Sequence, residues 1–149
     1  MNNFLLSKTG RLLFPFLLIM SLIVLYRGHN LPGGGFIGGL MAATAFILYA
    51  LGDSIQAARQ KLRVDPVILM AVGLLIAVVS GFFSMFLGKG FMTGLWLPTL
   101  KLPLLGTVHL GTPLIFDVGV FLTVIGFTLH TTFSFAKITH LEDDEEEES

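Results

Sequence analysis

The sequence predicts an all-α membrane protein with four transmembrane helices and a long apolar outer loop between the third and fourth helices. Of its 149 residues, 54% are hydrophobic and only 13% are charged, whereas about 25% charged residues is typical of soluble domains. The mean hydropathy is +0.83. Four apolar stretches carry this excess, and a soluble domain of this size has too little interior to bury them. The composition therefore indicates a membrane protein.

The first span is predicted over residues 5–26. Its uncharged run is only fifteen residues long, which is too short for a hydrocarbon core about 30 Å thick. The helix must therefore begin before Lys8 and Arg11, whose side chains then extend to the headgroups. The second span is predicted over residues 33–51, and Gly52 follows it at a position suited to a helix C-terminus.

The third and fourth spans are predicted over residues 66–87 and 113–135. Asp65 and Thr112 precede them as N-cap residues, and a proline follows each at the first helical position. The loop between them, Gly88–Gly111, is apolar but contains two prolines, which exclude a straight helix. Loops of this length usually carry function or lie against another surface. We therefore expect extended segments here, resting on the outer face, and a neighbouring protein.

The distribution of basic residues predicts that both termini are cytoplasmic. Six basic residues lie on the side of the termini and three on the opposite side. Residues 1–138 then form the membrane domain, and residues 139–149 form an acidic cytoplasmic tail, whose like charges predict disorder. The six are Lys8, Arg11, Arg59, Lys61, Arg63 and Lys137, and the three are Arg27, Lys89 and Lys101.

Small residues at helical spacing form the most distinctive motif. Three glycines open the second span, and glycine or alanine then recurs every four residues on two faces, as in membrane helices that pack closely. A phosphate-binding turn is the alternative, but no Gly-Lys-Ser/Thr and no preceding strand accompany it. The candidate helix-packing or interface residues are Pro32, Gly33, Gly34, Gly35, Phe36, Gly38 and Gly39 in this motif, and Gly73, Ala77 and Gly81 in the third span.

Asp117 is the one carboxylate inside a predicted span. A charge at the middle of a span costs about 2.5–3.5 kcal/mol on insertion scales, so such a residue usually faces protein or water. Asp117 follows Pro113 by four residues, so it lies near the outer end of its helix, where the helix dipole also stabilises a negative charge. Two interpretations stay open: a structural acceptor that pairs with Arg27 or His109, or a residue of an ion pathway.

The motifs of enzymes and of cofactor binding are missing. The chain has no cysteine, which excludes disulfides, thiolate metal sites and iron–sulfur clusters. Its four histidines are scattered over both sides of the membrane, so ligation of a haem by two facing histidines is unsupported. We therefore expect neither enzyme activity nor a cofactor or bound metal, and no nucleic-acid partner.

The segment Gly28–Gly39, which reads Gly-His-Asn-Leu-Pro-Gly-Gly-Gly-Phe-Ile-Gly-Gly, belongs to a four-span layout that also contains Phe116–Phe121. Together these features closely resemble the B subunit of the multisubunit sodium/proton antiporters of the Mrp or Mnh type, over residues 10–138. The resemblance implies a hetero-oligomeric antiporter in the cytoplasmic membrane. Larger subunits, related to the pumping subunits of respiratory complex I, supply the main proton route there, and the B subunit is required for assembly and exchange.

On this resemblance the expected partners are the other subunits of the antiporter and membrane lipid, with sodium ions and protons as the transported species. Similar modules also occur in membrane-bound hydrogenase complexes, so the parent complex has a second candidate. From the residues alone, two further alternatives stay open. One is a homo-oligomeric channel or carrier that uses Asp117 as its ion site, and the other is an assembly scaffold that takes no part in ion movement.

Overall fold

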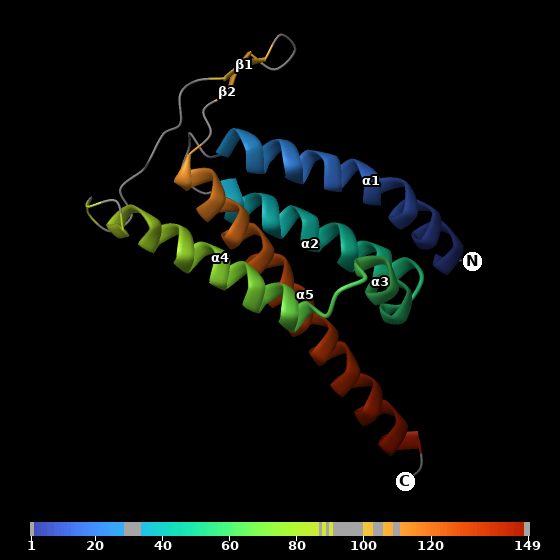
Figure 1. Ribbon diagram of the computed structural model, residues 1–149. Coiled ribbons are helices and arrows are strands. Elements are labelled where there is room, and N and C mark those ends of the chain that lie inside the picture. The colour runs from blue at the N-terminus through green and yellow to red at the C-terminus, as the bar shows by residue number, and fades with distance from the viewer. Residues whose placement is uncertain are drawn as a thin grey trace.

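A computed structural model of the chain describes residues 2–28, 34–86, 88, 90, 100–102, 106–108 and 111–147. Four helical segments are long and apolar enough to cross a membrane, namely Leu5–Gly28, Gly34–Gly52, Ile55–Phe83 and Thr112–Lys137. The predicted class, an all-α membrane protein with four spans, is confirmed. The elements, shown in Figure 1, are α1 (Asn2–Gly28), α2 (Gly34–Gly52), α3 (Ile55–Leu62), α4 (Pro66–Phe86), β1 (Leu100–Leu102), β2 (Gly106–Val108) and α5 (Thr112–Glu147).

The four long helices form a layer in the order α1, α2, α5 and α4 (Figure 1), in which α1 also makes a smaller direct contact with α5. α2 packs against α1 on one side and against α5 on the other, while α4 packs against α5. Each helix therefore covers only part of its neighbours, and between 22% and 44% of the most apolar window of each span is buried. Many large apolar side chains consequently remain exposed on the surface of the layer.

α2 approaches both of its neighbours backbone to backbone through its glycines. A Cβ atom on Gly38 would lie 2.9 Å from the carbonyl oxygen of Ser21 in α1 and 3.4 Å from Cδ2 of Phe121 in α5. A Cβ atom on Gly39 would lie 2.9 Å from the carbonyl oxygen of Phe121. Larger side chains at these positions would push the helices apart, so the small residues set the spacing of the layer.

The second contact surface, between α4 and α5, uses the same device. A Cβ atom on Gly73 would lie 2.5 Å from the backbone nitrogen of Thr123, and one on Gly119 would lie 2.5 Å from the backbone nitrogen of Ala77. Gly126, two turns further along α5, is equally close to the first turn of α4. Glycines on both helices thus hold α4 against α5.

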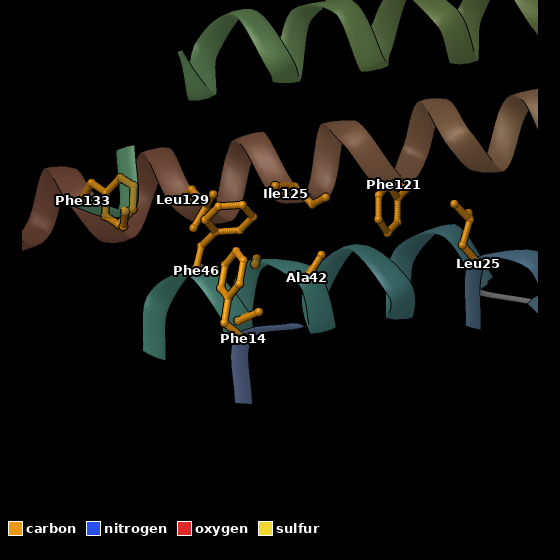
Figure 2. Packing of buried hydrophobic residues seen from close by; sticks show 11 residues of the cluster. Phe14, Leu25, Ala42, Phe46, Phe121, Ile125, Leu129 and Phe133 are labelled. Carbon is orange, nitrogen blue, oxygen red and sulfur yellow. The ribbon is translucent and has the colours of Figure 1, made fainter. Parts of the chain in front are cut away.

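Apolar side chains fill the space between α1, α2 and α5 (Figure 2). The rings of Phe14 and Phe46 meet edge to face, with centroids 5.0 Å apart and an interplanar angle of 87°. Leu129 of α5 is fully buried in this cluster. The buried members are Phe14, Leu25, Ala42, Ala43, Ala45, Phe46, Ala58, Phe121, Ile125, Leu129 and Phe133.

The segment between the second and third spans contains a helix that the sequence patterns did not predict. α3 begins after Ser54, whose side chain accepts a hydrogen bond from the backbone nitrogen of Ala57, and it ends at Arg63 in the left-handed conformation. Its residues are good helix formers, and Ala58 is fully buried against the core. Only eight residues long, the helix is too short to stand out by apolar periodicity.

Two further segments bear on the sequence predictions. Within the Gly88–Gly111 loop, β1 and β2 pair in antiparallel fashion, with Leu100 opposite Val108, so extended segments are present as expected.

Residues 139–147 continue α5 as helix, whereas a disordered tail is predicted for 139–149. Extending an existing helix costs far less than nucleating a new one, and glutamate is a good helix former.

The close approach at Gly38 gives a test of the fold. We expect Gly38→Leu to separate α2 from α1 and α5 and to destabilise the protein, because overpacking typically costs about 1–3 kcal/mol. The matched control is Thr44→Leu, which adds a similar side chain at an exposed position of the same helix. The measurement is the apparent melting temperature of the detergent-solubilised protein, and equal values for the two variants would contradict the assigned contact.

Candidate functional site

Asp117 lies in the second turn of α5, half-buried, where α5 crosses the beginning of α2. A Cβ atom on Gly35 would collide with the backbone carbonyl of Asp117, so the two backbones touch at this residue. Of its two predicted partners, Arg27 is exposed in the last turn of α1 and His109 lies outside the described residues. The carboxylate thus sits at a helix crossing near one end of the layer.

The candidate packing residues fall mainly on the two contact surfaces described above. Gly34, Gly35, Gly38 and Gly39 are buried in α2, where Gly34 meets Gly28 of α1. Phe36 differs from them, because its side chain is 53% exposed and points away from the rest of the chain. In the third span Gly73, Ala77 and Gly81 are all buried. Pro32 and Gly33 lie outside the described residues.

The opposite end of the layer carries a polar cluster that the sequence patterns did not predict. Arg11 of α1 donates from Nε to Oδ2 of Asp53 at 3.0 Å and from Nη2 to Oδ1 at 2.8 Å. Ser7 donates from Oγ to Oδ1 of the same carboxylate at 2.7 Å. Asp53 follows the last turn of α2, so this two-pronged ion pair ties the first half of α1 to the α2–α3 turn.

These contacts determine the protonation state of Asp53. The hydrogen bonds from Arg11 and then from Ser7 favour the charged form and hold the pKa of Asp53 well below its usual range. The Asp53 side chain is only 14% exposed, whereas the Arg11 side chain is 63% exposed. The carboxylate therefore stays ionised at neutral pH, and its role in the described structure is to accept hydrogen bonds.

Two cations of α3 sit over aromatic rings next to this cluster. Nζ of Lys61 lies 4.6 Å from the ring centroid of Phe14 and 4.5 Å from that of Tyr49. Cζ of Arg59 lies 5.5 Å from the ring centroid of Phe133 in α5. Cation–π contacts of this kind fasten α3 across the ends of α1, α2 and α5.

Sequence reasoning missed the Arg11–Asp53 pair for an identifiable reason. The sequence predicts that Arg11 extends to the headgroups, since nothing local couples it to a residue 42 positions away. The one available signal is that Asp53, directly after a span, is predicted to lie on the same side of the membrane as Arg11. That signal restricts Asp53 to one side of the membrane but does not identify its partner.

The two carboxylates are far apart. Asp117 contacts the first turn of α2 and Asp53 follows its last turn, so about 27 Å of helix separates them at 1.5 Å per residue. The groove between α4 and α5, of about 350 Å³, has no titratable side chain in its lining, where Thr123 is the one polar residue. Within the described part of the chain, no three histidine, aspartate or glutamate side chains are grouped as a metal site would require.

The fold and these contacts define a multi-pass membrane protein built for helix packing. Residues 5–130 match the family model described as a domain related to the MnhB subunit of Na⁺/H⁺ antiporters. The B subunit of the Na⁺/H⁺ antiporter of Alkalihalophilus pseudofirmus is 37% identical over 136 residues, which cover 91% of this chain and 94% of that protein. The chain therefore belongs to the MnhB family of antiporter subunits.

A solved structure has the same fold. It is that of the Mrp complex from Dietzia sp. DQ12-45-1b, which matches with a TM-score of 0.70 and 40% sequence identity over 86% of this chain. The match spans only 13% of the solved chain. The present chain therefore corresponds to one part of a much larger polypeptide in that complex.

The Arg11–Asp53 pair gives a prediction for pH dependence. Because the pKa of Asp53 is lowered on folding, its stabilising contribution is fully present above the unfolded value of about 3.9 and is lost as the pH falls through the lower folded value. We expect Asp53→Asn to lower the apparent melting temperature by a constant amount between pH 5 and 8, and the deficit to shrink only in stronger acid.

The matched control for this prediction is Asp65→Asn. Asp65 is exposed and caps α4 by accepting a hydrogen bond from the backbone nitrogen of Val67 at 2.8 Å, a role that asparagine fills almost as well. Asp65→Asn should therefore change the melting temperature little. A deficit for Asp53→Asn that grows as the pH falls from 8 to 5 would contradict the assigned ion pair.

Proposed function

We propose that the chain is a small subunit of a multisubunit sodium/proton antiporter in the cytoplasmic membrane and that it supports assembly and exchange by packing against larger subunits. It has no enzymatic reaction of its own in this proposal. The name of its Alkalihalophilus relative, which is that of an antiporter component, supports the antiporter over a hydrogenase complex.

The observation that carries the proposal is the single layer of helices. An ion pathway needs walls on all sides, whereas in the described part of the chain the four helices pack mainly as a row, in which α1 does not pack against α4. Large apolar side chains are exposed along all four spans, for example Leu12, Leu40, Leu75 and Phe127. Extended apolar surfaces of this kind fit lipid on one side and neighbouring subunits on the other.

We further propose that both termini lie in the cytoplasm. The beginning of α1, α3 and the end of α5 lie at one end of the layer, and the strands lie at the other (Figure 1). The six basic residues of the predicted cytoplasmic side are in these three elements or directly after α3. The acidic residues at the end of α5 would then face the cytoplasm.

Purification through a tag on this chain tests the proposed assembly. We expect larger hydrophobic subunits to copurify in mild detergent, because the exposed faces of the layer need partners. The chain expressed alone and reconstituted in vesicles should give no sodium-driven proton flux. Robust exchange by the lone chain would instead support the homo-oligomeric carrier and contradict the accessory role.

Asp117 separates a structural role from an ion pathway. We propose the pathway role, because a carboxylate in an otherwise uncharged span is a functional candidate. Asp117→Asn keeps the shape and most hydrogen bonding but removes the titratable proton. Sodium-dependent proton exchange, normalised to assembled complex on native gels, should then fall steeply with an altered pH profile.

The conservative variant Asp117→Glu retains the titratable group and is expected to retain part of the exchange. If Asp117→Asn gives normal amounts of complex, a normal rate and an unchanged pH profile, the residue is a structural acceptor and not a pathway residue.

A further inference from the structure

A groove with two arginines lies at the turn between α3 and α4. Its volume is about 390 Å³. Two arginines and the first residue of α4 contribute to its walls. Its lining consists of Arg59, Gln60, Arg63, Val64, Asp65 and Pro66.

The backbone of the turn places both arginines in this groove. Arg63 has a positive φ of 62° and donates its backbone N–H to the carbonyl oxygen of Arg59 at 3.1 Å. Arg63 directly follows α3, so this hydrogen bond holds it one turn beyond Arg59 at the end of the helix. The Arg59 guanidinium is also held against the ring of Phe133. The turn thus has a fixed backbone position for Arg63 and a side-chain contact for Arg59.

Within the described side chains, the positive charge of this region is not paired with a carboxylate. Among the side chains that the structure describes, no carboxylate lies within salt-bridge distance of Arg59, Lys61 or Arg63. Asp53 is occupied by Arg11 and Ser7. Asp65 is part of the lining, but its Oδ1 accepts the backbone N–H of Val67 and caps α4. An anion in the groove would therefore meet two guanidinium groups and one carboxylate that is already hydrogen-bonded.

The groove lies where the chain passes from one long apolar helix to the next. α3 connects α2, which ends at Gly52, to α4, which begins at Pro66, and we expect a basic turn between two spans to lie near the lipid headgroups. An apolar surface adjoins the groove directly, because Val64, Val67 and Ile68 are 44%, 42% and 57% exposed. A charged groove beside an exposed apolar surface matches a molecule with a phosphate and an acyl chain better than it matches free phosphate.

We propose that this groove binds the phosphate of an anionic phospholipid, with the acyl chains lying along the exposed beginning of α4. The planar guanidinium groups of Arg59 and Arg63 donate paired hydrogen bonds to the phosphate oxygens, a geometry that a lysine cannot provide. This role goes beyond the proposed subunit function and does not depend on it. It also differs from the general effect of basic loops on orientation, which depends on charge count and not on position.

The test compares lipid retention by two double variants of the tagged protein, each purified with whatever subunits accompany it. Arg59→Gln/Arg63→Gln removes both guanidinium groups of the groove. Lys8→Gln/Lys137→Gln removes the same charge from the same predicted side and leaves both arginines in place. Both are titrated in detergent with phosphatidylglycerol, and the bound lipid is counted by native mass spectrometry. We expect about tenfold weaker binding for the arginine variant only.

Further arms identify the ligand. Phosphatidylcholine, with no net charge, should bind more weakly than phosphatidylglycerol to the unaltered protein, and inorganic phosphate without lipid should not occupy the groove. Arg59→Lys/Arg63→Lys keeps the charge but loses the paired geometry, so it should bind with intermediate affinity, and it replaces the glutamine variant if that variant fails to fold.

If both glutamine double variants bind phosphatidylglycerol as tightly as the unaltered protein does, the proposed site is wrong. An equal loss in both would also overturn it, because the effect would then follow from charge count alone. Occupation of the groove by inorganic phosphate in the absence of lipid would overturn the assignment to a phospholipid.

Discussion

The approach of α2 to both neighbours at backbone distance is the constraint on which the rest of the structure depends. Gly34 and Gly38 face α1, whereas Gly35 and Gly39 face α5. Inside a bilayer the hydrophobic effect does not drive helices together, so association relies on van der Waals contact between closely fitted surfaces. Because two sides of one helix carry small residues, α2 takes a central place in the row, and α4 is added by the same means on the far side of α5.

Polar groups complete this arrangement at its ends without entering its middle. Arg11 and Asp53 join α1 to the α2–α3 turn. The two cations of α3 lie over aromatic rings of α1, α2 and α5. Several hydroxyl groups within the spans bond back to their own helices, as Ser21 does to the carbonyl oxygen of Leu18 at 2.7 Å. These hydroxyl groups do not join one helix to another, and the close backbone contacts at the glycines set the spacing of the helices.

Much of this architecture could be predicted from the sequence, because the bilayer imposes a length and a polarity on each span. The apolar runs identify four spans, and the prolines after Asp65 and Thr112 mark the beginnings of the last two. The small-residue spacing selects Gly34, Gly35, Gly38 and Gly39, which are buried. Periodicity does not encode which helices are neighbours, so the order of the row and the Arg11–Asp53 pair were not predictable. Phe36 is selected by its place in the motif, and because it is exposed, its role as an interface residue stays a prediction.

A layer one helix thick restricts what such a chain can contribute to ion exchange. It can form one wall of a pathway, and the remaining walls must come from other subunits. The centre of that wall is apolar over the α4–α5 groove, and Asp117 lies in the second turn of α5, near one end of the layer. On the proposed function and orientation, an ion passing along this wall would meet Asp117 near the outer mouth and the charges around Arg11 and Asp53 near the inner one, with no charged side chain lining the α4–α5 groove between them. Exchange at greater depth then depends on ionisable groups of the larger subunits, whose position the glycine-packed layer would fix.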